Sequence, residues 1–129
     1  MDSSVLFVTP YPQDARSLGQ MLDEASIPVV HAESVKDARR KLGKEIFGVV
    51  LTEAKLDDGT WLDVLELTRS SGTHVVVTDA WADARFWATA INLGAYDLLA
   101  QPFRRTEVQR VLASASLRPL CVKVGAAAS

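Results

Sequence analysis

Three apolar runs in this chain each end in a polar side chain that could take part in phosphate or metal chemistry. The run VVLTE ends in Glu53, the run VVVT ends in Thr78, and the run LLAQ ends in Gln101. The carboxyl ends of parallel strands meet at one edge of an open α/β sheet, so these side chains are the first place to look for function. They include neither a set of carboxylates that could enclose a metal ion nor a nucleophile paired with a base. The sequence therefore predicts a polar site at this edge that lacks a metal cage and an activated nucleophile.

Apolar runs typical of buried strands alternate with stretches of helical period along the chain. Strands are predicted near residues 5–8, 27–31, 47–53, 74–78 and 96–100. Helices are predicted near residues 14–25, 34–43, 61–69, 83–94 and 106–115. Ser34 and Asp83 are suitable N-terminal caps, and Gly94 is a suitable terminating residue. Because strands that alternate with helices need crossover connections, the pattern predicts one α/β domain with a parallel sheet covered on both faces.

The composition limits the classes of protein to which the chain can belong. It has 129 residues, 48% of them hydrophobic and 23% charged, which is ordinary for one globular domain. The formal net charge of −2 offers no electrostatic surface for nucleic acid, and no apolar run approaches the length of a transmembrane helix. The N-terminus lacks the basic start of a signal peptide, and the single Cys121 excludes an internal disulfide. We therefore expect a cytoplasmic protein that binds neither nucleic acid nor membrane.

Two segments carry a resemblance to a known family. Residues 78–83 place a hydroxyl at a strand end before an aromatic loop, and residues 92–103 read NLGAYDLLAQPF, a helix that closes on Gly-Ala and a strand that leads to Pro-Phe. These segments resemble the receiver domain of bacterial two-component response regulators, and the resemblance covers residues 5–115. It implies a flavodoxin-like (CheY-like), doubly wound (βα)5 three-layer sandwich with a parallel sheet of order 2-1-3-4-5. A receiver-like domain is expected over residues 1–116, followed by a tail or linker over residues 117–129.

The resemblance also implies a function for six positions. In receivers, two acids after the first strand help to hold Mg²⁺, an Asp at the end of the third strand accepts the phosphoryl group, and a Ser or Thr ends the fourth strand. A Lys precedes the proline after the fifth strand, and that strand carries an aromatic side chain that moves inward with the hydroxyl. The matching positions here hold, in this order, Thr9, Pro10, Glu53, Thr78, Gln101 and Leu98. Only Thr78 keeps the residue type of the family, so the positions form a degenerate phosphorylation site.

These replacements combine against phosphoryl transfer. Mg²⁺ prefers a near-octahedral shell of hard oxygens with at least one or two carboxylates, and Glu53 beside Thr9 and Pro10 is a poor cage. Without the metal, and with Gln101 in place of a lysine, no positive group stabilises the negative charge of a transferring phosphoryl group. We therefore expect weak or absent Mg²⁺ binding, no other metal or cofactor, no catalytic residue and no enzymatic activity.

The position of Glu53 allows two interpretations. Its charge could imitate the phosphorylated state, or it could be a partly exposed acid that persists after the site decayed. The second interpretation is preferred because an imitation should draw Thr78 and an aromatic side chain inward, and Leu98 is not aromatic. In either case, Gln101 could donate its amide to Glu53 as a neutral replacement for an ion pair.

Other polar residues that could do chemistry are assigned to structure. Asp57 and Asp58 precede Gly59 in a turn cluster, where aspartate is favoured because its side chain bonds to nearby backbone groups. His31 and His74 have no Ser or Cys at a useful spacing, so they predict no nucleophilic site.

The aromatic residues indicate where a partner could bind. Trp87 shares a helical face with three other apolar residues and is expected to pack inward. Trp81 and Phe86 have no inward partner by period and are expected at the surface, where exposed aromatic residues mark interfaces. In receivers, the fourth helix, fifth strand and fifth helix form the face for dimer and partner contacts, and the resemblance implies the same face here. Its candidate members are Trp81, Arg85, Phe86, Asn92, Asp97, Arg105 and Arg110.

We therefore expect an atypical receiver that acts in signal transduction as a phosphorylation-independent module for protein binding or dimerisation. The expected partner is a protein, such as a sensor kinase, an output domain or a second copy in a homodimer. One alternative is a phosphoacceptor with a rearranged, Mg²⁺-dependent site. Another is a small flavodoxin-like domain that binds a nucleotide or flavin. The last alternative is weakened because residues 9–13 contain no glycine that would expose backbone amides to a phosphate.

Overall fold

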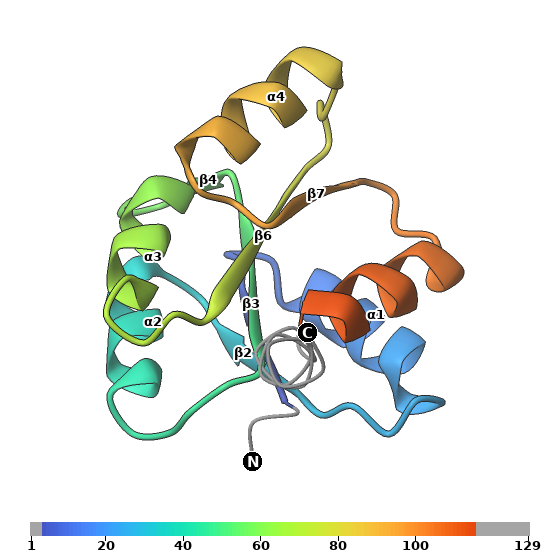
Figure 1. Cartoon of the computed structure of the whole chain (residues 1–129). Helices are drawn as coiled ribbons and strands as arrows, with labels where there is room; N and C mark the ends of the chain where they lie inside the picture. The colour runs from blue at the N-terminus through green and yellow to red at the C-terminus, as the bar shows by residue number, and fades with distance from the viewer. Residues whose placement is uncertain (1–3, 116–129) are drawn as a thin grey trace, which may run out of the picture.

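Five parallel strands form the central sheet of the computed structural model, which describes residues 4–115 (Figure 1). The strands of this sheet are β1 (Val5–Val8), β2 (Val29–Ala32), β3 (Val49–Glu53), β6 (His74–Asp79) and β7 (Asp97–Ala100). They lie in the order β2-β1-β3-β6-β7, and every neighbouring pair is parallel. When only these five strands are counted, the order is 2-1-3-4-5, which confirms the predicted topology.

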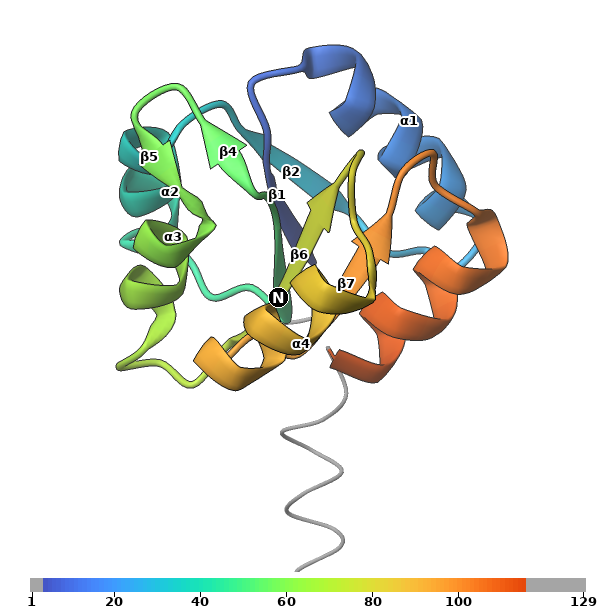
Figure 2. The same ribbon diagram turned by 90° about the horizontal axis from the view of Figure 1, so that it is seen from above.

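Helices cover both faces of the sheet. They are α1 (Pro12–Asp23), α2 (Val35–Leu42), α3 (Trp61–Thr68), α4 (Ala84–Leu93) and a helical stretch over residues 105–115, the 105–115 helix. Figure 2 shows α2, α3 and α4 on one side of the sheet and α1 with the 105–115 helix on the other. The fold is therefore the expected three-layer sandwich. No helix within the described residues is long and apolar enough to cross a membrane.

Alternating side chains of the strands build a separate apolar core on each face. In β1, Leu6 and Val8 belong to the core beneath α2, α3 and α4, whereas Val5 and Phe7 belong to the core beneath α1 and the 105–115 helix. Successive residues of a strand point to opposite faces, so a sheet covered on both sides needs continuous apolar runs. The four residues predicted to face inward from the 105–115 helix are all buried: Val108, Val111, Leu112 and Ala115.

Helices α2 and α4 begin and end where the sequence predicts. Ser34 Oγ accepts a hydrogen bond from the amide of Asp37 at 3.0 Å, and Asp83 accepts one from the amide of Phe86 at 2.8 Å. Each bond satisfies a backbone donor that the first turn of a helix leaves without an intrahelical partner. Gly94 ends α4 with a φ of 118°, in the left-handed region that glycine adopts without strain.

A short hairpin between β3 and α3 is absent from the sequence prediction. Its strands, β4 (Lys55–Leu56) and β5 (Gly59–Thr60), pair antiparallel on either side of a turn at residues 57–58. Asp58 accepts hydrogen bonds from the amides of Val35 and Lys36 at 2.8 and 3.0 Å, and these bonds hold the pKa of its carboxyl below the usual range. The turn interpretation is confirmed, and Asp58 also fastens the hairpin to the start of α2.

The inward face of α4 differs from the prediction. Trp87, expected to pack inward, is 48% exposed, whereas Phe86, expected at the surface, is half-buried and packs against Trp61. Ala90, one turn after Phe86, is the buried residue of this helix. Because α4 carries apolar residues on two sides, its period allows two orientations, and packing against α3 selects the side of Phe86. The predicted tail over residues 117–129 lies outside the described residues.

We expect Gly94→Ala to lower the free energy of unfolding by about 1–3 kcal/mol, because backbone strain of this kind has that cost. Alanine is strained at a φ of 118°, and its Cβ would lie 3.3 Å from Cδ2 of Leu65. Gly19→Ala is the control, since a Cβ at this position of α1 meets nothing within 4 Å. The control should raise the free energy of unfolding by about 0.5–1 kcal/mol. Urea denaturation measures both changes, and a Gly94→Ala variant as stable as the wild type would contradict the expectation.

Candidate functional site

Glu53 lies at the centre of the polar edge of the sheet. It is the last residue of β3, which pairs with β1 on one side and β6 on the other. This topology places Glu53 beside Thr9, which directly follows β1, and beside Thr78, its register partner in β6. Glu53 is only 6% exposed, so the interpretation of this residue as a partly exposed acid is wrong. The sequence could not reveal this burial because it results from contacts with segments far apart along the chain.

Two neutral side chains hold the carboxylate of Glu53. Thr9 Oγ1 donates to Oε2 at 3.1 Å. Gln101 Nε2 lies 3.1 Å from Oε1 and 3.2 Å from Oε2 of the same carboxylate. The prediction that Gln101 donates its amide to Glu53 is therefore confirmed, and both carboxylate oxygens accept hydrogen bonds within the site.

The hydroxyl of Thr78 is directed toward β7. Its Oγ1 donates to the backbone oxygen of Leu99 at 2.8 Å and accepts a hydrogen bond from Gln101 Nε2 at 3.2 Å. A hydroxyl has a single proton, so the bond to Leu99 uses the donor capacity of Thr78. Thr78 therefore ties β6 to β7 and reaches Glu53 only through the shared amide of Gln101.

Burial raises the pKa of the Glu53 carboxyl to about 6. The hydrogen bonds from Gln101 and Thr9 favour the charged form and limit this rise, whereas the charges of Asp14 and Asp79 add to it. Within residues 4–115, no Lys, Arg or His forms an ion pair with Glu53. Neutral dipoles therefore supply the stabilisation of its charge that the site provides.

Asp14, Asp79 and His31 are site residues that the sequence reasoning does not single out as such. Asp14 lies in the first turn of α1, Asp79 directly follows Thr78 at the end of β6, and both are half-buried. The ring nitrogen Nε2 of His31 lies 2.7 Å from the backbone oxygen of Thr9 and holds the end of β1 in place. The signal that could have found them is a polar residue within a few positions of each strand end.

The two remaining positions of the predicted site contribute no donor to Glu53. Pro10 is half-buried in the turn before α1 and has no backbone N–H. Leu98 is half-buried and packs against the core beneath α2, α3 and α4. Among residues 4–115, no group of three or more His, Cys, Asp or Glu side chains is arranged to hold a metal ion.

Some candidate residues for the partner face gather around α4. Arg85 and Asn92 are exposed on α4 itself, and Trp81, in the loop before it, is 86% exposed. Asp97, at the start of β7, accepts a hydrogen bond from Nε1 of Trp87 at 3.2 Å. These residues therefore surround one helix, with Trp81 at its N-terminal end and Asp97 on the β7 side.

The other candidates for this face are held elsewhere. Arg105 forms an ion pair with Glu24, the residue that follows α1, and this contact draws it away from α4. Arg110 is exposed on the 105–115 helix. Phe86 is half-buried against Trp61, so it contributes to the interior side of α4.

Comparisons with known proteins give relatives that are similar in sequence to most of this chain. No protein-family model matches it. The chain is 29% identical over 112 residues to response regulator protein PilR of Pseudomonas aeruginosa, across 85% of this chain and 25% of PilR. It is 28% identical over 120 residues to the acid tolerance regulatory protein ActR of Rhizobium meliloti, across 92% of this chain and 60% of ActR. The chain thus spans less than two thirds of these curated relatives.

Solved structures share the fold over nearly their whole length. A response regulator receiver domain protein from Clostridium thermocellum matches with a TM-score of 0.82 at 18% identity, across 93% of this chain and 98% of that one. The beryllofluoride-activated NtrC4 receiver domain dimer matches with a TM-score of 0.81 at 21% identity, across 90% and 98%. The chain therefore has the fold of response regulator receiver domains and is similar in sequence to response regulators. The edge around Glu53 lies at the ends of β1, β3 and β6, the positions for which the sequence resemblance implies phosphorylation chemistry.

The ionisation of Glu53 should make the stability of this domain depend on pH. The folded state retains the proton up to about pH 6, whereas the reference pKa of a glutamate is 4.5. This group therefore favours folding most below pH 4.5, and its contribution should be lost as the pH rises through 6, by up to about 2 kcal/mol and less where solvent screens the charge.

Glu53→Gln should lack this loss, while the other acids titrate in both proteins. Urea denaturation from about pH 4 to about pH 7.5 measures the difference between the two profiles. An identical pH dependence in both proteins would show that Glu53 does not retain its proton in the folded state.

Gln101→Ala should lower the free energy of unfolding by about 1–3 kcal/mol, because Glu53 and Thr78 lose a shared donor in a buried site. It should also raise the pKa of Glu53 further, since the lost amide favours the charged form. Gln109→Ala is the matched control, because Gln109 Nε2 donates to the backbone oxygen of Met21 at 2.9 Å. NMR titration of the Glu53 carboxyl carbon measures the pKa, which should move in Gln101→Ala alone. A pKa shift of equal size in both variants would contradict the statement that Gln101 stabilises the charged form of Glu53.

Proposed function

We propose that this receiver domain is an atypical one, a pseudo-receiver that acts in two-component signalling by binding proteins and without accepting a phosphoryl group. On this proposal it is a cytoplasmic module with no enzymatic activity of its own. The observation that carries the proposal is the burial of Glu53 at the acceptor position, where Thr9 and Gln101 engage both of its carboxylate oxygens.

The geometry around Glu53 works against phosphoryl transfer in two ways. An acceptor oxygen must approach phosphorus in line with the leaving group, but both oxygens of Glu53 are drawn toward donors inside the site. The transferring group also needs positive charge around it, which Mg²⁺ and a Lys supply in the family that the sequence resembles. Thr9 and Gln101, which stand at the corresponding positions, are neutral.

The site also offers no movable link to the surface. Thr78 donates to the backbone oxygen of Leu99, so its hydroxyl is already committed. Leu98 packs against the apolar core and has no polar end that could exchange between core and solvent. On this proposal, the surface formed by α4 and β7 keeps one arrangement, which suits a module that binds its partner constitutively.

The surface proposed for a protein partner is an apolar stripe on α4. Its members, which share one helical face and are exposed or half-exposed, are Ala84, Trp87, Ala88 and Ile91, the α4 stripe. The indole of Trp87 is held by its hydrogen bond to Asp97. A positioned tryptophan among small residues offers the apolar area that protein interfaces use.

The proposed partner of the α4 stripe is a sensor kinase or an output domain, and a second copy of the chain is a further proposed partner. The NtrC4 receiver domain is itself a dimer in its beryllofluoride-activated form. We propose that this chain forms a homodimer as well, without needing phosphorylation to do so.

One observation favours a second candidate function, a phosphoacceptor with a rearranged, Mg²⁺-dependent site. Asp14 and Asp79 lie close enough to Glu53 for their charges to raise its pKa. Their carboxylates supply hard oxygens of the kind that Mg²⁺ prefers, but within residues 4–115 they are not arranged to hold a metal ion, so this candidate requires the site to rearrange.

Light scattering after size-exclusion chromatography, with and without Mg²⁺ plus beryllofluoride, separates the two candidates. The proposed function predicts a dimeric mass in both conditions. It also predicts that the amide resonances of Thr78 and Gln101, measured by NMR in the same two conditions, stay unchanged. Changes that require both Mg²⁺ and beryllofluoride would show a site that senses phosphate and would overturn phosphorylation independence. Asp79→Asn is the matched control, because a rearranged metal site that uses Asp79 should lose those changes in this variant.

A further inference from the structure

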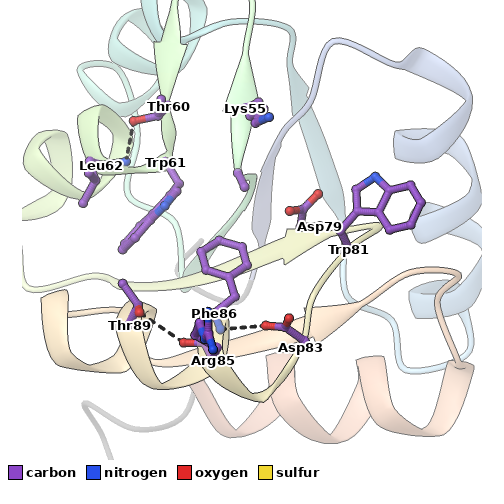
Figure 3. A pocket seen from close by; sticks show the side chains of 11 residues that line it. Lys55, Thr60, Trp61, Leu62, Asp79, Trp81, Asp83, Arg85, Phe86 and Thr89 are labelled. Atoms are coloured by element: carbon purple, nitrogen blue, oxygen red, sulfur yellow. Dashed lines mark hydrogen bonds between the residues drawn. The ribbon is translucent and has the colours of Figure 1, made fainter.

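A cleft of about 520 Å³ opens beside the polar edge, between the β4–β5 hairpin with the start of α3 and α4 with the loop before it (Figure 3). Its volume lies within the range of pockets that bury a small ligand or a large side chain. Glu53, Thr9 and Gln101 do not line it, whereas Asp79 does, so the cleft adjoins the site described above and shares Asp79 with it.

Aromatic rings form the inner wall of this cleft. Trp61 is 6% exposed, and its ring lies edge to face against the ring of Phe86, with 6.5 Å between centroids and 63° between planes. Leu62, 46% exposed at the start of α3, extends the apolar wall toward solvent. Trp61 is almost fully covered and forms the floor of the cleft, whereas the half-buried ring of Phe86 is the part of this pair that a third aromatic ring can meet.

Several polar groups that line the cleft already have partners in their own helices. Thr60 Oγ1 accepts a hydrogen bond from the amide of Leu62, and Asp83 accepts one from the amide of Phe86. Thr89 Oγ1 donates to the backbone oxygen of Arg85. These groups therefore offer little hydrogen bonding to a polar ligand, and the wall that remains is mainly apolar.

Trp81 lies at the rim of the cleft with 86% of its surface exposed. Figure 3 shows its ring beyond Asp79, apart from the rings of Trp61 and Phe86. A tryptophan side chain buries roughly 150–250 Å² when it enters a pocket, so its exposure leaves a large apolar area in water. The molecule thus presents an apolar cleft and an aromatic side chain of suitable size next to each other.

The charges around the rim balance one another. Lys55 and Arg85 are positive, Asp79 and Asp83 are negative, and within residues 4–115 none of the four forms an ion pair. A strongly acidic or basic partner would meet two charges of its own sign. A second copy of the same rim, turned by a twofold axis, can instead place each cation opposite an anion.

We propose that the cleft is a self-association site in which each copy of the chain inserts its Trp81 against Trp61 and Phe86 of the other copy. The contact is isologous, so the same rim serves as donor and acceptor in both copies. Arg85 and Lys55 of one copy then face Asp79 and Asp83 of the other, which sets the register of the pair.

This inference rests on the homodimer of the proposed function and adds the surface that forms it. Two exchanged tryptophans bury roughly 300–500 Å², a substantial part of the roughly 1,600 Å² of a standard interface. The cleft and the α4 stripe lie on different sides of α4, so a dimer built through the cleft leaves Trp87 available to another protein.

The experiment measures the dimer dissociation constant of the full chain by sedimentation or light scattering across a dilution series. Trp81→Ser should raise this constant at least about thirtyfold, the effect of losing an interface hot spot. Trp87→Ser is the matched control, since it removes the same residue type from the α4 stripe, and it should change the constant less than about threefold.

Arg85→Asp tests the charge register without altering the aromatic wall. It should weaken the dimer, and the difference from the wild type should shrink at high salt because exposed ion pairs are screened. Tryptophan emission should shift to longer wavelength when the wild type is diluted below its dissociation constant, and Trp81→Ser should lack most of this shift.

Each outcome bears on a separate statement. A dimer that Trp81→Ser leaves intact, or that only Trp87→Ser disrupts, overturns the cleft as the interface while homodimerisation stands. A wild type that remains monomeric overturns both the cleft and the homodimer. Phosphorylation independence is judged apart from these results, by the resonances of Thr78 and Gln101 with Mg²⁺ and beryllofluoride.

Discussion

The hydrogen bonds around Glu53 join the carboxyl ends of four of the five sheet strands. Thr9 follows β1, Glu53 ends β3, Thr78 lies in β6, and Gln101 follows β7. The bond from Thr78 to Leu99 closes the cluster on the β7 side. The loops that begin α1 and α4 leave the sheet from this edge, so their starting positions depend on the same set of bonds.

Within residues 4–115, the cluster holds a buried acid that forms no ion pair with a cation. A carboxylate that leaves water loses solvation energy, and the neutral donors here recover part of it, which is why the pKa of Glu53 rises only to about 6. A cost of up to about 2 kcal/mol for ionising such a group is small beside the 5–15 kcal/mol that typically stabilise a domain. The fold can therefore retain an ionisable acid at this buried position.

Helix α4 has more apolar surface than one contact can bury. Phe86 and Ala90 pack inward, which leaves Trp87 and its neighbours on the outer side and Trp81 exposed in the loop before the helix. The sequence shows both apolar sides of α4, and its period assigns the inward position to the side of Trp87. That assignment is wrong because the packing surface of α3, with Trp61 at its start, decides which side is covered. The proposed binding surfaces follow directly from this choice.

By itself, the sequence determined the alternation of strands and helices, the helix caps and the meeting of Glu53, Thr78 and Gln101 at one sheet edge. These features depend on local period and on the direction shared by parallel strands, so they are readable along the chain. Only the tertiary structure decided that Glu53 is buried and that Asp14 and Asp79 raise its pKa. Burial depends on segments far apart in sequence, as with the hydrogen bond between Thr9 and Glu53 across 44 positions. Such contacts leave no periodic signal, because they arise only when the strands are placed side by side.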